Sequence, residues 1–133
     1  MLYPMLAMIM LTFIIGLYAV KVRFSSVRKG EVSANYYKLM SGDTAPEIVT
    51  KTTRSFNNQF EIPVLFYVAC TLYISQGIED FIGLASAWLF VVLRYVHAYV
   101  HLTYNHIIHR MSAFWLAFIC VMVLWINLVA QSM

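Results

Sequence analysis

The chain consists of long hydrophobic stretches separated by short polar segments. Residues 2–20 are almost entirely apolar, and as a helix they would rise about 28 Å, close to the thickness of a hydrocarbon core. Residues 58–75, 81–103 and 111–129 form three further stretches of this kind. Because short connections make consecutive spans antiparallel, the pattern predicts an all-α membrane protein with four transmembrane helices in an antiparallel bundle, a single domain over residues 1–133.

The composition supports a membrane protein and argues against a soluble domain. Of the 133 residues, 62% are hydrophobic and only 11% are charged, whereas soluble domains carry about 25% charged residues. The net charge of +3 comes from one loop, and basic residues do not alternate with aromatic ones as in a nucleic-acid-binding surface. We therefore expect contact with membrane lipids and no nucleic-acid partner.

The distribution of basic residues predicts the orientation in the membrane. Residues 21–54 contain seven Lys or Arg, and Arg110 lies in the turn on the same side. The opposite loop offers only Glu79 and Asp80. Since positively charged loops stay in the cytoplasm, we expect residues 21–57 to form a cytoplasmic loop and both termini to lie outside.

The loop itself divides into two parts. Residues 24–43 mix Ser, Gly and charged residues with apolar ones, which predicts a segment lying at the membrane interface. Residues 44–47, with a proline followed by an acidic residue, are typical of a helix start, and that helix is expected to continue to Ser75. Pro63 would clash with the carbonyl of Gln59, so we expect a kink there.

A first polar stripe lies where this helix enters the lipid. Arg54, Asn58 and Glu61 are separated by four and three residues, which places their side chains on one helical face. A cation, an amide and a carboxylate at that depth must be paired with each other or be available to a polar ligand.

A second polar stripe lies on the third predicted span. Arg94, His97, His101 and Tyr104 follow one another at intervals of three, four and three residues. An arginine at the centre of a span costs about 2.5–3.5 kcal/mol on insertion scales. Glu61 is the only acidic residue within a predicted span, so it is the expected partner of Arg94.

Two interpretations of these polar residues remain open. The residues could form a structural ion pair that locks two helices together. They could also line a positively charged pocket for an anionic ligand, next to a lipid-exposed groove for an apolar co-substrate. The number of hydrogen-bond donors near one membrane face favours the pocket. These residues are Arg54, Asn58, Arg94, His97, His101, Tyr104, His106, His109 and Arg110.

Two other functions fit less well. His97 and His101 have the spacing of a zinc-chelating pair, but the neighbouring arginines would repel a cation, and four histidines are too few for a membrane di-iron centre. We therefore expect no metal. A small multidrug exporter would need a carboxylate within the first span, and no charged residue precedes Lys21.

The two stripes together resemble the motif of a known family. The pattern Arg54-x3-Asn58-x2-Glu61-x-Pro63, followed by Arg94-x2-His97 and Arg110, resembles the MAPEG family, the membrane-associated proteins in eicosanoid and glutathione metabolism. The number of spans, the long first loop and the topology also match. The NQFE-x-PVLFY run is most similar to the bacterial branch, which implies a bacterial inner membrane.

The resemblance implies a homotrimer that binds glutathione as a co-substrate at subunit interfaces near the cytoplasmic side. It implies that Arg110 lies near the sulfur and favours the thiolate, and that Arg23 reaches the site of a neighbouring subunit. Arg94 would pair with Glu61, and His97 would contact the peptide. The full set of candidate glutathione-binding residues is Arg54, Asn58, Glu61, Arg94, His97, His101, Tyr104 and Arg23.

The function implied is that of a glutathione-dependent membrane transferase or peroxidase acting on lipophilic electrophiles or lipid hydroperoxides. Some positions differ from those of glutathione-using relatives: His101 replaces a tyrosine, His106 replaces an arginine, and Phe56 and Asn57 replace polar or basic residues. The family also includes a non-enzymatic member that presents lipid. A non-enzymatic membrane protein of the same fold, lipid-binding or structural, is therefore the alternative.

Overall fold

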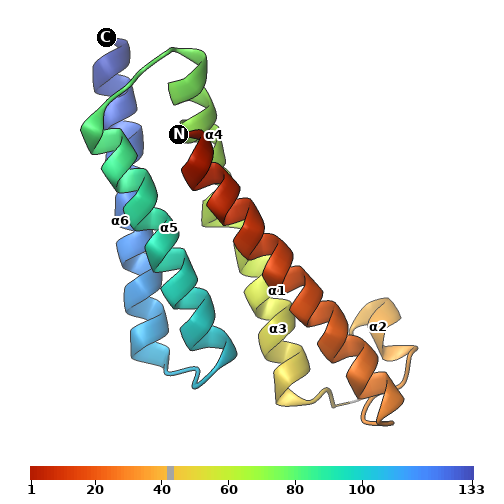
Figure 1. Ribbon diagram of the computed structural model, residues 1–133. Coiled ribbons are helices and arrows are strands. Elements are labelled where there is room, and N and C mark those ends of the chain that lie inside the picture. Colours follow the sequence, from red (N-terminus) through yellow and green to blue (C-terminus); the bar gives the residue numbers. More distant parts are fainter. Residues whose placement is uncertain (42–43) are drawn as a thin grey trace.

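The computed structural model describes residues 1–41 and 44–133, and in this part of the chain all regular structure is helical (Figure 1). The predicted interfacial segment can therefore be followed only as far as Ser41, because Gly42 and Asp43 lie outside the described residues. The helices in order are α1 (Leu2–Arg28), α2 (Tyr36–Leu39), α3 (Glu47–Asn57), the 3-10 turn η1 (Asn58–Phe60), α4 (Ile62–Ser75), α5 (Phe81–Leu102) and α6 (Ile107–Ser132).

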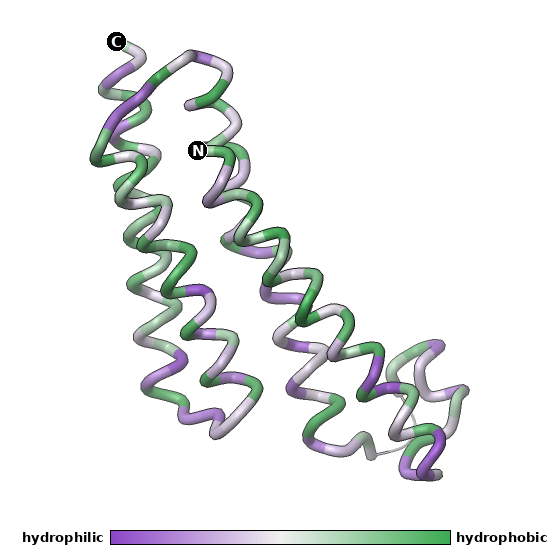
Figure 2. Tube along the Cα trace, viewed as in Figure 1, coloured by the Kyte–Doolittle hydropathy of each residue, from purple (hydrophilic) through white to green (hydrophobic). Residues whose placement is uncertain are grey.

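Three of these helices, α1, α5 and α6, are long and apolar enough to cross a membrane. Figure 2 shows the apolar stretches along these helices and hydrophilic residues towards the ends of the molecule. The second predicted span, residues 58–75, corresponds to α4, which has 14 residues and would rise only about 21 Å, less than the thickness of a hydrocarbon core. Figure 1 shows α3 and α4 following one another alongside α1.

The core lies between the helices, while many large apolar side chains point outward. Phe66 of α4 stacks on Phe90 of α5 with ring centroids 4.5 Å apart, and both rings are fully buried. Leu17, Val92 and Ile119 are examples of exposed apolar side chains on the three long helices. Such extensive apolar exposure would favour aggregation in water, whereas in a membrane it provides the surface that contacts lipid.

Pro63 divides the predicted second helix into two helices. Its ring would clash with the carbonyl of Gln59, and it has no N–H to donate to that carbonyl. The chain therefore tightens into η1, turns at Glu61 (φ −98°, ψ −107°) and restarts as α4 with Pro63 in the first turn, where no donor is needed. The structure thus shows a break over residues 58–61 where the sequence predicted a kink.

Two helix ends differ from those predicted. α1 continues past residue 20 to Arg28, and Gly30, with φ +70°, ends the last turn. The hydroxyl of Ser26 in this extension lies 2.6 Å from that of Tyr37, so the extension packs on the α2 segment. α6 begins at Ile107, which reduces the predicted turn at residues 103–110 to its first half.

The end of the bundle opposite the α5–α6 turn is held by a buried tyrosine. The Tyr73 hydroxyl donates to the carbonyl of Leu124 at 3.2 Å and accepts from the Asn127 amide at 2.8 Å. The Asn127 amide also donates to Asp80, whose carboxylate caps α5 by accepting from the backbone N–H of Gly83 at 2.7 Å. This network joins α4, α5 and α6.

Gly83 allows this network to form, which gives a first prediction. A Cβ at this position would lie 2.8 Å from Cε1 and 2.9 Å from the hydroxyl oxygen of Tyr73. We expect Gly83→Ala to lower the free energy of unfolding in detergent by about 1–3 kcal/mol, because overpacking must displace a fully buried ring. The control is Ala85→Ser, at an exposed position on the same helix, which should leave stability unchanged. Equal unfolding temperatures for the two variants would contradict the prediction.

Candidate functional site

A pocket of about 500 Å³ lies between the α3–η1 segment and the α5–α6 hairpin. We refer to it as the polar pocket. Six of the nine predicted site residues line it, and they come from three separate parts of the sequence. These are Arg54, Asn58, Glu61, His97, His101 and Arg110. One wall is apolar and is formed by Ile107, Met111, Phe114 and Trp115 of α6.

The first polar stripe forms one side of this pocket. Arg54 is exposed, and within the described part of the chain no hydrogen bond or ion pair engages its guanidinium group. The side-chain nitrogen of Asn58, oriented towards Glu61, donates to the two carboxylate oxygens at 3.1 and 3.2 Å. A carboxylate and a guanidinium group are therefore available to a ligand at this side of the pocket.

Arg94 does not form the predicted ion pair with Glu61. Its side chain is fully buried, and Nη2 donates to the backbone carbonyl of Asn58 at 2.7 Å. Among the described residues, the only ion pairs within 4.0 Å are Lys29–Glu31 and Lys51–Glu47. The physical reason is the break, which turns Glu61 out of the regular helical face shared by the stripe. Arg94 thus does not line the polar pocket, but it supports Asn58, which does, through that backbone carbonyl.

The second stripe meets the α5–α6 turn at the other side. The His97 and His101 rings lie 5.9 Å apart, with His97 against Phe114. The Nδ1 of His101 lies 3.0 Å from Oδ1 of Asn105, and Nη1 of Arg110 donates to the same oxygen at 2.8 Å. Asn105 is not among the residues predicted for the site; its place in the turn between two spans, where asparagine often takes a left-handed conformation, was the available signal.

Tyr104 and Arg23 do not line the polar pocket. Tyr104 is exposed, and its hydroxyl lies 3.0 Å from Nδ1 of His109 at the tip of the turn. Arg23 donates to the hydroxyl of Thr53 at 3.3 Å and lies 5.8 Å from the centre of the Tyr37 ring. These two residues belong to other surfaces of the chain.

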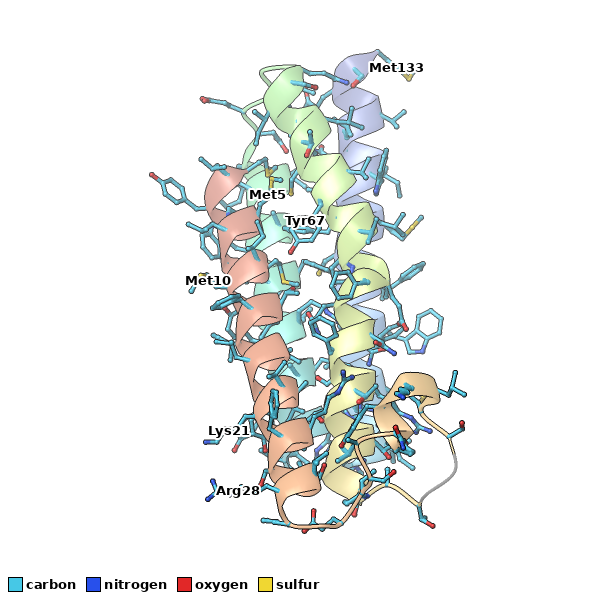
Figure 3. All side chains as sticks on the ribbon, turned by 90° about the vertical axis from the view of Figure 1, so that its right-hand side faces the viewer. Met5, Met10, Lys21, Arg28, Tyr67 and Met133 are labelled. Carbon is cyan, nitrogen blue, oxygen red and sulfur yellow. The ribbon has the colours of Figure 1, made fainter. Side chains whose placement is uncertain are left out.

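Arg23 instead lines a second depression, which we call the apolar groove. It has a volume of about 720 Å³ and runs between α1 and the α3–α4 segment. Phe13 and Leu17 of α1 face Phe56 and Phe60 across it, and Tyr67 lies between α1 and α4 (Figure 3). The groove therefore offers a lipid-like environment with one basic residue at its end.

The family assignment rests on the whole chain. A comparison with protein-family models matches residues 1–130 to the MAPEG family. The chain belongs to the MAPEG family. No curated protein and no solved structure matches it. Together with its three membrane-length helices, family membership makes this MAPEG protein an integral membrane protein.

The polar pocket of this MAPEG protein has the chemistry of a site for a small zwitterion or anion. Two arginines provide planar, bidentate donors for carboxylates, while Glu61 provides an acceptor for an ammonium group. Over residues 1–41 and 44–133, no group of three or more His, Cys, Asp or Glu side chains is arranged to hold a metal ion.

The two arginines of the first and second stripes should behave differently, which gives a second prediction. Arg94→Ala should lower the free energy of unfolding by about 2–4 kcal/mol, because it leaves a cavity and removes the donor to the Asn58 carbonyl. Arg54→Ala, at an exposed position, should change it by no more than about 0.5 kcal/mol. Unfolding in detergent measures both changes, and a large loss with Arg54→Ala would show that Arg54 is structural.

Proposed function

We propose that this MAPEG protein is a glutathione-dependent membrane transferase or peroxidase that acts on lipophilic electrophiles or lipid hydroperoxides. The observation that supports the proposal most directly is the polar pocket itself. Residues from α3, η1 and α6 that belong to the family motif converge on one space, next to an apolar wall. Family membership supports a glutathione-related role for that space.

Glutathione matches the charges of the polar pocket. The tripeptide carries two carboxylates, one ammonium group and one thiol. Arg54 would bind a carboxylate through its unengaged guanidinium group, while Glu61 and Asn58 would bind the ammonium group and the peptide backbone. A volume of about 500 Å³ lies within the usual range for small-molecule sites.

Arg110 would promote ionisation of the thiol. A free thiol has a pKa of about 8.5, so a nearby cation is needed for a substantial thiolate fraction at neutral pH. Arg110 is held at the pocket by its bond to Asn105. The thiolate would attack an electrophilic carbon and displace its leaving group. With a hydroperoxide it would attack the terminal oxygen, which breaks the O–O bond, releases the alcohol and leaves a sulfenic acid that a second glutathione converts to the disulfide and water.

The second substrate would approach from the bilayer. The wall formed by Ile107, Met111, Phe114 and Trp115 is apolar, and Trp115 is exposed on the outer surface of α6. A lipophilic electrophile dissolved in the membrane would thus meet the thiolate at the boundary between this wall and Arg110. This arrangement keeps a water-soluble co-substrate and a membrane-soluble substrate in one site.

The same proposal includes the membrane arrangement. The whole of residues 1–133 would form one domain with four membrane crossings. Three are made by α1, α5 and α6, and the remaining one, second in chain order, is made by α4 extended by η1 and α3. The polar pocket would face the cytoplasm of a bacterium with both termini outside its inner membrane, since Lys21 and Arg28 lie at the pocket end of α1, remote from Met133 (Figure 3). Homotrimer assembly would cover the apolar groove and bring Arg23 towards a neighbouring polar pocket.

Ligand binding and turnover test the proposal, which is the third prediction. At a glutathione concentration of 100 Kd, the folded state should gain about 2.7 kcal/mol of stability. Purified protein should conjugate glutathione to a reactive aryl halide. Arg54→Ala should raise KM for glutathione, and Arg110→Ala should lower kcat. The control is Arg28→Ala, at the end of α1 outside the polar pocket, which should retain wild-type kinetics.

A non-enzymatic role is the second candidate, and one observation favours it. Arg94 is engaged by the backbone of η1, so part of the polar stripe is structural in the protomer. If millimolar glutathione leaves the unfolding temperature unchanged, and no electrophile or hydroperoxide is turned over, the polar pocket serves lipid headgroups or helix packing instead.

A further inference from the structure

Asn105 has an unusual backbone conformation in the α5–α6 turn. Its φ is +49°, which Asn and Gly adopt more readily than other residues, and its N–H donates to the carbonyl of Val100 at 2.8 Å. This conformation lets the chain reverse within the few residues between Leu102 and Ile107. It also directs the Asn105 side chain back towards the polar pocket, where it meets one residue from each helix.

One oxygen atom joins these two residues. Oδ1 of Asn105 lies 2.8 Å from Nη1 of Arg110 and 3.0 Å from Nδ1 of His101. The two nitrogens are 3.3 Å from each other. Both His101 and Arg110 line the polar pocket, whereas Asn105 does not, so Asn105 supports the site from behind.

These contacts favour one position for the hydrogen on His101. A guanidinium group only donates, so the Asn105 atom that faces Arg110 is the oxygen. That oxygen only accepts, and it lies closer to Nδ1 of His101 (3.0 Å) than the Arg110 donor does (3.3 Å), so the contacts favour a hydrogen on Nδ1. A second hydrogen on Nε2 would add a positive charge to a buried ring 3.3 Å from Arg110, which is unfavourable in the absence of a ligand.

We propose that Asn105 is a positioning residue that fixes the Nδ1–H tautomer of His101 and holds the guanidinium group of Arg110 at the polar pocket. Nε2 of His101 then accepts the proton of the bound thiol. The proposal rests on the proposed function, because it needs a thiol in the polar pocket. Nδ1 is engaged by the turn, which leaves Nε2 as the only ring nitrogen with a lone pair for the ligand.

The step is balanced in protons and charge. The S–H bond of glutathione breaks and an Nε2–H bond forms on His101, while the electron pair remains on sulfur. The resulting thiolate lies between the imidazolium and Arg110, and its negative charge offsets the repulsion between the two cations. After the thiolate displaces a halide from an aryl substrate, Nε2 releases the proton to solvent.

Other ionisable groups surround His101 and enter the same balance. Arg54 of α3 and Glu61 at the break line the polar pocket opposite it, His97 lies one helical turn away, and Arg110 faces it from α6. Arg54 and Arg110 oppose a cation on His101, and Glu61 favours one. His101 can therefore hold the proton when a thiolate lies beside it, because the negative charge on sulfur offsets the two arginines.

The tautomer can be tested without glutathione, by nitrogen-15 NMR of histidine-labelled protein in detergent micelles, with His101→Gln used to assign the signal. We expect the Nδ1–H tautomer in the wild type. Asn105→Gly, which keeps the backbone conformation but removes the oxygen, should shift His101 towards the commoner Nε2–H form. Asn105→Asp, which keeps an acceptor oxygen, should retain Nδ1–H. A wild-type Nε2–H signal, or no change in Asn105→Gly, would overturn the proposal.

The proton transfer is tested by the ultraviolet absorbance of the bound thiolate as a function of pH, together with kcat for an aryl halide. His101→Phe should shift thiolate formation to higher pH and lower kcat about 100-fold, the contribution of a positioned proton acceptor. Asn105→Gly should cause a smaller shift of thiolate formation to higher pH and a smaller loss of kcat. Asn105→Asp should behave like the wild type in both measurements. The control Thr103→Ser, an exposed residue of the same turn outside the polar pocket, should change neither.

The outcomes separate the two proposals. If glutathione fails to bind the wild type, the proposed function is wrong, although the tautomer measurement still tests the role of Asn105. If glutathione binds and is turned over but the pH of thiolate formation is the same in His101→Phe, the assignment of His101 as proton acceptor is wrong and the proposed function stands.

Discussion

The missing backbone donor of Pro63 is the constraint on which the rest of the site depends. A continuous helix would pair the carbonyls of Asn58 and Gln59 with the amides of residues 62 and 63, and proline cannot supply the second. The chain therefore breaks over residues 58–61. The break releases the Asn58 carbonyl, and the guanidinium group of Arg94 takes its place as donor. The break between α3 and α4 thus supplies the acceptor for a hydrogen bond from α5.

This attachment helps explain how Arg94 can be fully buried although no carboxylate among the described residues lies within 4.0 Å of it. A guanidinium group in the interior needs hydrogen-bond acceptors, and a backbone carbonyl released from a helix supplies one. Nε and Nη1 of Arg94 have no partner among the described residues, so its burial remains costly. Glu61 forms no ion pair with Arg94 within 4.0 Å and lies at the polar pocket, where the side-chain nitrogen of Asn58 donates to it. The negative charge of Glu61, which an ion pair with Arg94 would have neutralised, is therefore available to a ligand in the polar pocket.

The helical period predicted much of the fold and part of the candidate site. Spacings of four and three residues place Arg54, Asn58 and Glu61 together, as they do His97 and His101, and the structure has these residues at one pocket. The partner of Arg94 could not be predicted, because spacing assumes a regular helix and the break rotates Glu61. The turn position of Asn105 could be predicted from its residue type, but its contacts with His101 and Arg110 could not, since they form only when α5 and α6 pack. Tyr104 follows the spacing of its stripe, yet α5 ends two residues earlier, at Leu102, so it lies on the turn.

The broken segment also links the two depressions on either side of it. Arg54, Asn58 and Glu61 face the polar pocket, while Phe56, Gln59 and Phe60 line the apolar groove. These two sets therefore lie on opposite sides of the same short stretch. The end of α3 and the 3-10 turn η1 therefore form part of the wall of both depressions, with Asn58 on the side of the polar pocket and Gln59 and Phe60 on the side of the apolar groove.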